Sequence, residues 1–391
     1  MGYRYAVLGA GRQGVAAAYD LSRHGEAEEI LLLDSDPDAA SRGCEKVDRL
    51  AGLPVARPLS FDASDASALT RALAGVHAAL SALPFPLNPP AARAAIEAGC
   101  CFNDLGGNTA VVQEELSLHE EALRKGVSIV PDCGLAPGLA NLIAVAGMGR
   151  LERPRSVRIW CGGLPKTPLP PLGYKLVFNI AGLTNEYTGE AVVLREGRVA
   201  RLPALSGEEM VEFAPPVGRC EAFLTSGGTS TCPWTFEGKL ESFEYRTVRY
   251  PGHLAKIRAL AELGFFQREA VNVSGMKVSP REVTHALLSA RLDFPGEPDL
   301  VVLRVRVAGQ ERDRGMAIVI DLMEHPDPAT GFSAMERCTA FPAAAVAWLQ
   351  ARGEVPPGAR PQEISVPAGR LVEESRRRGL AVKETQDPGG R

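Results

Sequence analysis

The sequence predicts an α/β protein, in which a doubly wound parallel sheet is followed by a second α+β domain with a mostly antiparallel sheet. Three observations predict this fold class. Short apolar strand patterns alternate with Ala-rich helical stretches up to about residue 130, which is typical of parallel sheets with helical crossovers. The glycine-rich turn GAGRQG joins the first strand to the first helix. From about residue 155, longer and more polar strands are joined by short turns, which indicates hairpins.

Length and composition narrow the class of protein. With 391 residues the chain is too long for one ordinary core, so we expect two or three domains. A formal net charge of -4 gives no reason to expect nucleic acid or an anionic membrane as a partner. No apolar run reaches the roughly 18 residues that span a bilayer. The first strand pattern begins by Tyr3, which leaves no room for a targeting peptide, so we expect a cytoplasmic protein.

The eight cysteines are scattered and form no C-x-x-C pair. In a cytoplasmic chain this pattern predicts reduced thiols and neither a disulfide framework nor a metal site.

The first domain, residues 1–131, is expected to alternate strands with helices. Apolar runs bounded by turn residues predict the strands, and Ala-rich stretches predict the helices. The strands are expected at 3–8, 28–34, 55–61, 77–82, 100–104 and 127–130. The first helix is expected to run from the glycine turn to about residue 24, and the others lie at 66–74, 89–98 and 110–125.

The second domain, residues 132–330, is expected to contain two hairpins and two helices. AVVL and VARL flank a turn at 195–198, and VVLRVRV (301–307) precedes GMAIVIDLM (315–323). Helical patterns cover 253–264 and 280–292. One face of such an antiparallel sheet would carry the core, and the other could cover a partner subunit.

The C-terminal part is expected to be helical again. Residues 331–382 include the helical pattern ERCTAFPAAAVAWLQARG, and we expect this segment to return to the first domain. The tail at 383–391 is polar and glycine-rich, so disorder is expected there.

The GAGRQG turn has the context that a dinucleotide-binding fingerprint demands, since it follows a strand, opens a helix and precedes an acid at the end of the next strand. In a Rossmann fold, Gly9 would make the tight turn, Gly11 would let the backbone approach a pyrophosphate, and Gly14 would let the helix pack on the sheet. The backbone amides of Arg12 and Gln13 would point at the phosphates from the helix N-terminus.

Asp34, at the end of the second strand, is placed to accept hydrogen bonds from the adenosine ribose hydroxyls. Asp36 and Asp38 add negative charge, and the next basic residue is Arg42. A 2′-phosphate would meet repulsion there, so the sequence favours NAD over NADP as the cofactor.

Three further loops follow the C-terminal ends of strands, where ligands bind in such sheets. Asp62 could reach the adenine, the second loop would lie along the pyrophosphate or nicotinamide ribose, and the third would lie nearest the nicotinamide. A plain turn role stays open for each side chain. The candidates of the second loop are Ser81, Ala82, Leu83 and Pro84, and those of the third are Asp104, Leu105, Gly106 and Gly107.

Several segments resemble a known family when taken together and in order. GAGRQG, NDLGGN (103–108), DCGLAPGLAN (132–141), GLTNEYTGEAVVLREGRV (182–199), EAFLTSGGTST (221–231) and TVRYPGHLAKI (247–257) resemble the saccharopine dehydrogenase-like superfamily. The similarity extends to about residue 375. DCGLAPG and RYPGH are broad superfamily motifs, whereas GLTNEYTGEA and EAFLTSGGTST are most similar to the lysine 6-dehydrogenase branch.

The resemblance implies the reaction of that branch, which is NAD-dependent oxidation of the ε-amino group of L-lysine. The products are 2-aminoadipate 6-semialdehyde, which cyclises to a piperideine carboxylate, and ammonia. The resemblance also implies a homo-oligomer, a dimer or tetramer, held partly through the sheet of the second domain. Two alternatives stay open: a saccharopine- or carboxynorspermidine-type enzyme acting on a secondary amine, and a non-catalytic NAD-binding protein.

Oxidation of a lysine side chain requires groups that grip an amino acid and groups that move protons. An α-carboxylate is bound by Arg or by hydroxyl donors, and an α-ammonium by acceptors. Candidates for binding the substrate are Arg249 and its neighbour Tyr250, Thr225, Ser226, Thr229 and Ser230 for the carboxylate, and Asn185, Glu186 and Asp104 for the ammonium.

Three residues are candidates for acid–base catalysis: His253, Lys256 and Asp104. His253 follows Pro251-Gly252 and starts a helical pattern, where the helix dipole favours the neutral imidazole that a base needs. Lys256 lies one turn further along. The sequence leaves a purely structural role open for both, in which His253 packs at the start of the helix and Lys256 is solvated.

Overall fold

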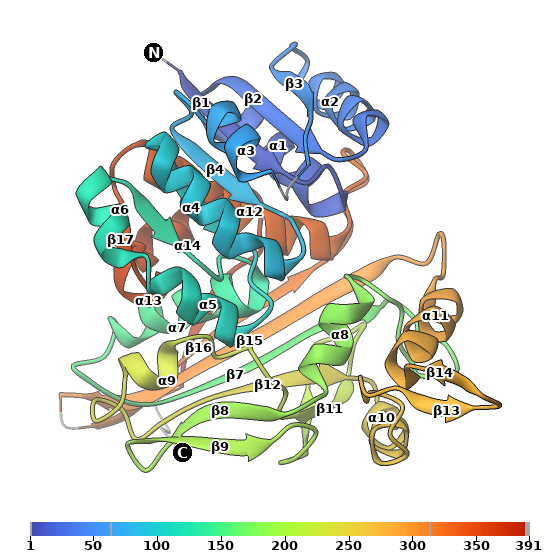
Figure 1. The fold of residues 1–391 in the computed structure, drawn as a ribbon. Helices are drawn as coiled ribbons and strands as arrows, with labels where there is room; N and C mark the ends of the chain where they lie inside the picture. Colours follow the sequence, from blue (N-terminus) through green and yellow to red (C-terminus); the bar gives the residue numbers. More distant parts are fainter. Residues whose placement is uncertain (1, 63–64, 313, 388–391) are drawn as a thin grey trace. The chain divides into compact units, whose positions relative to one another are not determined.

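The structure is a computed structural model that describes residues 2–62, 65–312 and 314–387. The chain divides into two compact units, which are coloured along the sequence in Figure 1. Unit 1 comprises the residues up to 150 together with 328–332 and 336–382. Unit 2 comprises 151–327, 333–335 and the C-terminal segment from 383.

Unit 1 is built on a seven-stranded sheet in which every neighbouring pair of strands is parallel. The order is β17-β6-β5-β4-β1-β2-β3, which confirms the predicted doubly wound sheet and places the switch point at β1. The strands are β1 (Tyr3–Leu8), β2 (Ala27–Asp34), β3 (Ala56–Ser60), β4 (Ala78–Ser81), β5 (Cys101–Asp104), β6 (Ser128–Val130) and β17 (Gly358–Ala359).

Helices pack around this sheet, and one of them, α2, was not predicted from the sequence. Asp36 caps α2, with its side chain accepting from the amide of Asp38, and Pro37 opens the helix. Both are ordinary helix-start signals. The helices are α1 (Arg12–His24), α2 (Pro37–Ala51), α3 (Ala66–Ala72), α4 (Asn88–Ala98), α5 (Thr109–Leu116), α6 (His119–Lys125), α7 (Ala140–Met148), α12 (Ala334–Ala351), α13 (Gln362–Ser365) and α14 (Ala368–Arg377).

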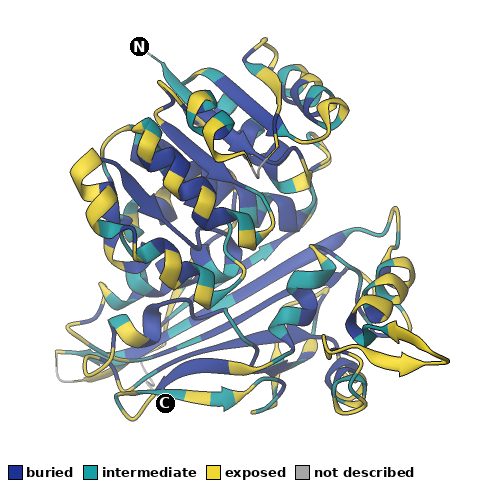
Figure 2. Ribbon diagram, in the orientation of Figure 1, coloured by how far each residue is buried: buried dark blue, intermediate teal, exposed yellow. Residues whose placement is uncertain are grey.

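The core of unit 1 follows from the apolar strands and the small residues of the helices. The central strands of the sheet are buried along most of their length in Figure 2, whereas the edge strand β3 is largely exposed. On α4, Ala91, Ala92, Ala94 and Ala95 are buried in the same core cluster as Leu8 and its neighbours. Small side chains let a helix lie close to the sheet, so the Ala-rich pattern serves packing as well as helix propensity.

Unit 2 is built on a nine-stranded, mostly antiparallel sheet, as the sequence predicts. Both predicted hairpins are present, and β12 with β7 is a parallel pair within the sheet. The strands are β7 (Arg153–Pro165), β8 (Glu190–Arg195), β9 (Arg198–Pro203), β10 (Glu209–Glu212), β11 (Arg219–Phe223), β12 (Ser242–Arg249), β15 (Asp299–Glu311), β16 (Arg314–Glu324) and β18 (Lys383–Asp387).

Four helices and a small separate hairpin complete unit 2. They are α8 (Ile180–Glu186), α9 (Cys232–Thr235), α10 (His253–Glu262) and α11 (Pro280–Leu292), with the hairpin of β13 (Val271–Val273) and β14 (Met276–Val278). The hairpin is exposed along almost its whole length in Figure 2.

The prediction of a disordered tail is wrong for residues 383–387. They form β18, which pairs antiparallel with β16 from Lys383 opposite Asp321 to Asp387 opposite Ala317. The free edge of β16 offers unpaired backbone groups, and pairing satisfies them whatever the tail's side chains are. The rest of the predicted tail, 388–391, lies outside the described residues.

All eight cysteines are free thiols. In the part of the chain that the structure describes, no helix combines the length and the apolar character needed to cross a membrane.

Candidate active site

The glycine turn after β1 has the geometry of a dinucleotide-binding turn. Gly9 has φ +97°, a conformation that favours glycine. A Cβ on Gly14 would lie 1.8 Å from the carbonyl oxygen of Gly9, so a larger residue cannot fit there. A Cβ on Gly11 would meet nothing within 4 Å, which leaves the backbone open to a ligand. These three environments fit the roles that the fingerprint requires.

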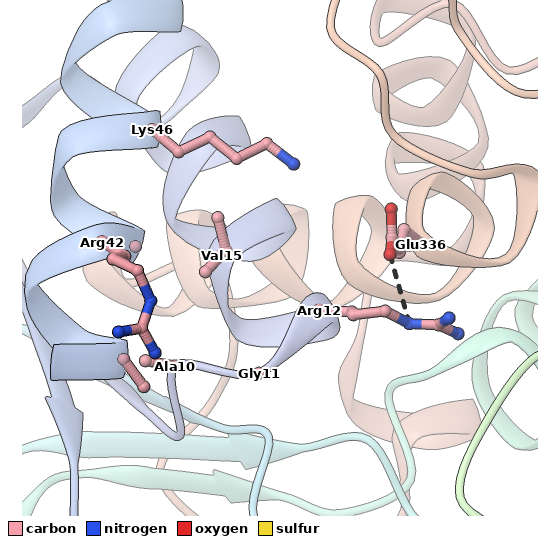
Figure 3. Close-up of a pocket in the computed structure, with 9 residues that line it drawn as sticks. Ala10, Gly11, Arg12, Val15, Arg42, Lys46 and Glu336 are labelled. Carbon is pink, nitrogen blue, oxygen red and sulfur yellow. Dashed lines mark ion pairs between the residues drawn. The ribbon is translucent and has the colours of Figure 1, made fainter. Parts of the chain in front are cut away.

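A pocket of about 260 Å³ lies beside this turn (Figure 3). Three basic side chains line it from α1 and α2, and Glu336 lines it from α12. Arg12 Nε lies 3.3 Å from Glu336 Oε1. The lining residues are Ala10, Gly11, Arg12, Val15, Ala39, Arg42, Gly43, Lys46 and Glu336. The basic lining and the helix N-terminus suit a pyrophosphate.

Lys46 and Glu336 were not among the residues predicted for this site from the sequence. Lys46 lies one helical turn after Arg42, so recognition of α2 would have placed both on one face. Glu336 is separated from Arg12 by more than three hundred residues, and no local pattern joins them.

Asp34 is fixed at the edge of the turn by two backbone amides. Its Oδ2 accepts from Ala10 N at 2.7 Å, and its Oδ1 accepts from Asp36 N at 2.9 Å. The surroundings are less acidic than the sequence predicts, because Arg42 lies 3.7 Å from Asp36 and lines the pocket together with Lys46. Acidic and basic groups are therefore nearly balanced where a cofactor ribose would lie.

Two glycine variants separate packing from ligand approach. We expect Gly14→Ala to destabilise unit 1 by more than about 3 kcal/mol, because its Cβ would overlap Gly9. We expect Gly11→Ala to fold normally and to weaken dinucleotide binding by about tenfold or more, because its methyl group enters the space open to a ligand. Thermal unfolding and fluorescence titration with NADH measure the two effects, and a Gly11→Ala protein that binds NADH normally would contradict the assignment.

The other predicted loops of unit 1 differ in how exposed they are. Asp62 is exposed after β3, and Ala82, Leu83 and Pro84 are half-buried or exposed after β4. Ser81 is buried, and its hydroxyl lies 2.8 Å from Asn88 Oδ1 at the start of α4. Ser81 therefore holds the chain between β4 and α4, and its hydroxyl is not available to a cofactor.

The turn after β5 contains the predicted residues Leu105, Gly106 and Gly107, which are half-buried or exposed. Asp104, in contrast, is 1% exposed, and its Oδ1 accepts from Gly106 N at 2.6 Å. Burial raises the pKa of Asp104 to about 6, against the effect of its amide donors Gly106 and Asp132. The carboxyl group is therefore too buried for the predicted contact with substrate. Its hydrogen bond with Gly106 N instead holds the conformation of the turn.

Arg249, at the end of β12, is the centre of a buried polar cluster in unit 2. Its Nε donates to Tyr187 Oη at 3.1 Å, its Nη1 donates to Val248 O at 2.9 Å, and its guanidinium lies 4.7 Å from the ring centre of Tyr174. Its Nη2 lies 3.7 Å from Glu186 Oε2. The guanidinium is thus rigidly held, with one edge turned to a carboxylate.

His253, predicted as a candidate general base, has both ring nitrogens engaged in hydrogen bonds in this structure. Nδ1 lies 3.0 Å from Leu172 O, and Nε2 lies 2.9 Å from Tyr187 Oη. A carbonyl only accepts, so Nδ1 carries the proton and Nε2 accepts from the tyrosine. Burial, followed by the charge of Arg249, lowers the pKa of His253 to about 3. With both nitrogens engaged, His253 holds Tyr187 and Leu172 in place at the start of α10.

The other acid–base candidate of this segment, Lys256, contacts a backbone carbonyl. It is exposed on α10, and its Nζ donates to Pro171 O at 2.6 Å. This contact ties α10 to the segment that precedes α8.

The predicted substrate-binding residues of unit 2 fall into two groups. Asn185 and Glu186 end α8, and Ser226 contacts both of them: its hydroxyl donates to Asn185 O at 2.8 Å, and its amide donates to Glu186 O at 3.0 Å. These three are half-buried. They lie in the same unit as Arg249, which pairs with Glu186.

The other predicted residues are buried and bonded to neighbouring groups. Thr225 shares a hydrogen bond of 2.7 Å with Thr247, Thr229 donates to Val192 O, and Tyr250 donates to Pro165 O. Ser230 is 3% exposed. Their hydroxyls therefore serve the packing of unit 2, and substrate contact is not supported for them.

Glu186 combines partial exposure to solvent with a raised pKa. Its side chain is 27% exposed, whereas Arg249 is 3% exposed. Burial raises the pKa of Glu186 to about 7, although the charge of Arg249 opposes the shift. A partly exposed carboxyl that titrates near neutral pH is a candidate to contact a substrate.

Comparisons with known proteins agree with both units. Residues 5–130 match the family model of the saccharopine dehydrogenase NADP binding domain, and residues 134–373 match that of the saccharopine dehydrogenase C-terminal domain. The solved structure of apo saccharopine dehydrogenase (L-Glu forming) from Saccharomyces cerevisiae is similar with a TM-score of 0.77 and 18% identity. That match covers 99% of this chain and 100% of the other and confirms the fold.

Two curated relatives are similar in sequence. Saccharopine dehydrogenase [NADP(+), L-glutamate-forming] of Saccharomyces cerevisiae is 23% identical over 274 residues, which cover 66% of this chain and 59% of the yeast protein. Alpha-aminoadipic semialdehyde synthase of Arabidopsis thaliana is 25% identical over 263 residues, which cover 63% of this chain and 24% of the plant protein. The matched region is thus little more than half of one relative and a quarter of the other.

The family models identify the family of this chain and do not distinguish between the branches of that family. The C-terminal-domain model alone matches more than half of the chain, and the model of the nicotinamide-binding domain covers the glycine turn and Asp34. The chain therefore belongs to the saccharopine dehydrogenase family of oxidoreductases.

Proposed function

We propose that this protein is an NAD-dependent dehydrogenase that oxidises the ε-amino group of L-lysine. The products would be 2-aminoadipate 6-semialdehyde, which cyclises to a piperideine carboxylate, and ammonia. The observation that carries the proposal is the pairing of Arg249 with the partly exposed Glu186. These residues lie in the segments RYPGH and GLTNEYTGEA, and the second segment is the one most similar to the lysine branch.

Arg249 and Glu186 together fit the head of an α-amino acid. The carboxylate and ammonium of an amino acid stand on one carbon atom, and the side chains of Arg249 and Glu186 approach to 3.7 Å. In the proposed mode Arg249 Nη2 binds the carboxylate, and ionised Glu186 accepts from the ammonium. Tyr187, Tyr174 and His253 hold the guanidinium in place, so little side-chain entropy is lost on binding.

The chemistry of the ε-amine sets the expected pH dependence. A nicotinamide, when bound, supplies the hydride acceptor, and hydride leaves a carbon only with help from a neutral nitrogen. Deprotonating a free lysine amine at pH 7 costs about 4.6 kcal/mol. His253 has no free nitrogen to accept that proton. We therefore expect activity to rise well above neutral pH, as the amine itself loses its proton.

The preference for NAD over NADP is part of this proposal, and a variant that changes the charge at the ribose site tests it. We expect NAD to be preferred, because Asp34 and Asp36 oppose a 2′-phosphate. Asp34→Asn keeps an acceptor for the backbone and removes one charge, so Arg42 and Lys46 would dominate the pocket. The NAD-to-NADP preference should then fall by about tenfold or more, measured as the ratio of the two kcat/KM values.

The matched control is Asp38→Asn, in the first turn of α2. It removes the same charge without touching the ribose position, so a much smaller shift is expected. An Asp34→Asn protein with an unchanged preference would show that the cofactor choice is made elsewhere.

A saccharopine-type reaction on a secondary amine is the second candidate, and the family models and the yeast relative favour it. Its substrates carry more carboxylates than lysine and need more cations. Arg246 is 6% exposed and pairs with Glu209 at 3.2 Å and Glu244 at 3.1 Å. Arg219 is exposed on β11. The cationic grip thus depends mainly on Arg249, which favours the smaller substrate.

A panel of substrates separates these functions. Purified protein with NAD should form NADH with L-lysine between about pH 7 and pH 10, and little with saccharopine. NADH formation with saccharopine alone would select the second candidate. Tight NAD binding without turnover on any amine would mean that the protein is a non-catalytic binder.

We also propose that the protein is a cytoplasmic homodimer or homotetramer. Large apolar side chains are exposed on α11, on the small hairpin and just after α10, and such exposure is typical of contact surfaces. The residues are Leu263, Phe265, Val271, Val273, Met276, Val283 and Leu287. Light scattering would give the mass in solution.

A further inference from the structure

The turn after β5 is anchored at both ends by side chains. At its start, Asp104 Oδ1 accepts from Gly106 N at 2.6 Å. At its end, Asn108 Oδ1 accepts from Ala110 N at 2.9 Å and from Val111 N at 3.3 Å, which caps α5. The turn between them, Leu105–Gly107, is therefore held at both ends by backbone-to-side-chain bonds.

Glu115, near the end of α5, reaches back to the start of the same turn. It is 0% exposed, neither of its carboxyl oxygens has a hydrogen-bond donor in the described part of the chain, and Asp104 Oδ2, whose charge acts on Glu115, is likewise buried without one. Two carboxyl groups can share a hydrogen bond only if one of them carries a proton. A third carboxyl group, that of Asp132, is 2% exposed. Its charge and that of Glu114 also raise the pKa of Glu115. The thiol of Cys133 lies in the field of the same acids.

The hydrogen bonds decide which carboxyl of the pair holds the proton. Asp104 Oδ1 accepts from two backbone amides, Gly106 N at 2.6 Å and Asp132 N at 3.4 Å, and such donors favour the ionised form. No donor among the described residues reaches either carboxyl oxygen of Glu115, and burial followed by the charges of Asp104 and Asp132 raises its pKa far above the usual range. The proton therefore belongs to Glu115.

We propose that Glu115 is a positioning residue, which stays protonated at neutral and alkaline pH and donates its proton in a hydrogen bond to ionised Asp104. This bond ties α5 to the end of β5 and so closes the turn at Leu105–Gly107. The role of this bond in the reaction rests on the proposed function. The turn lies at the C-terminal end of β5, where a Rossmann fold binds its cofactor. A proton retained at high pH keeps the turn closed where oxidation of an amine is fastest.

Stability as a function of pH tests the protonation directly. A carboxyl whose pKa is higher in the folded than in the unfolded state makes folding take up a proton, so stability falls as pH rises above its usual pKa. Glu115→Gln keeps a donor to Asp104 and needs no proton. The urea midpoint of this variant should therefore exceed that of the wild type, by little near pH 5 and by more near pH 9.

Two further variants make this result specific. Glu114→Gln, on the exposed neighbour, removes a smaller charge effect on Glu115 than that of Asp104 or Asp132 and should change the urea midpoint far less than Glu115→Gln near pH 9. Glu115→Ala removes the donor and leaves a cavity, so it should lower the midpoint at every pH. If Glu115→Gln lowers the midpoint as Glu115→Ala does, with no dependence on pH, the proposal is overturned.

Cofactor binding measures the effect of the Glu115 variants on the turn. Affinity for NADH, measured by fluorescence titration near pH 9, should be kept in Glu115→Gln and reduced severalfold in Glu115→Ala. Equal loss in both variants would overturn the positioning role. If the wild type bound no nicotinamide dinucleotide, the proposed function would fail, while the stability result would still decide whether Glu115 holds the proton.

Discussion

Replacing Arg378 by methionine is expected to lower the free energy of unfolding of unit 1 by about 3–5 kcal/mol. The Arg378 side chain is fully buried, and its Nε lies 2.9 Å from Asp20 Oδ2 on α1. Its Nη1 lies 2.5 Å from Glu374 Oε2 on α14. Methionine fills much of the same volume, but it leaves the 1%-exposed Asp20 without a counter-charge. An uncompensated buried charge is among the most costly changes in a core.

The matched control for this prediction is Arg377→Met. Arg377 pairs with the same Glu374 at 3.1 Å, but its side chain is 67% exposed. Solvent screens such a pair, so the loss should stay below about 1 kcal/mol. Urea unfolding followed by circular dichroism measures both variants. Equal losses would contradict the view that the buried pair with Asp20 attaches the C-terminal segment to α1.

The Arg378 variant should also change the pH dependence of stability. Burial raises the pKa of Asp20, and the charge of Arg378 opposes the shift. Without Arg378 the folded-state pKa rises further above the unfolded value, so folding takes up a proton and stability falls as pH increases. The loss in Arg378→Met should therefore be larger near pH 8 than near pH 5.

The geometry of the glycine turn could be predicted from sequence because its determinants are local. Gly9, Gly11, Gly14 and Asp34 lie within one strand–helix–strand segment, and each role depends on its neighbours in the chain. The fold class followed from the same kind of signal, since the alternation of strands and helices is also local. Glu336 could not be predicted, because α12 brings it to the pocket from the other end of the chain.

Roles that depend on distant hydrogen bonds could not be predicted. The spacing of RYPGH indicated correctly that a strand ends and a helix begins, with His253 at its first position. Whether that imidazole is free depends on Tyr187 and on Leu172, which lie 66 and 81 residues away. Glu115 gave no signal either, because an acid in VVQEEL is normally exposed, and only the fold brings it to Asp104.

Glu186→Gln is expected to lower kcat/KM for L-lysine by roughly tenfold to a hundredfold, mainly through KM. A hydrogen bond to a charged group contributes about 1.5–3 kcal/mol, which corresponds to that range. In the proposed mode the ammonium of the substrate is bound equally in the ground state and in the transition state, so kcat should change little. Steady-state kinetics with L-lysine at saturating NAD measure the split.

The pH profile of the same variant distinguishes binding from proton transfer. Glu186 must be ionised to accept from an ammonium, and its pKa of about 7 means that kcat/KM of the wild type should rise through neutral pH. Glu186→Gln should lose this rise and keep the one at higher pH, which belongs to the ε-amine. Glu190→Gln, an exposed pair partner of Arg201 at 3.9 Å, should keep both. A loss confined to kcat would instead mean that Glu186 acts in the chemical step, as a general base would.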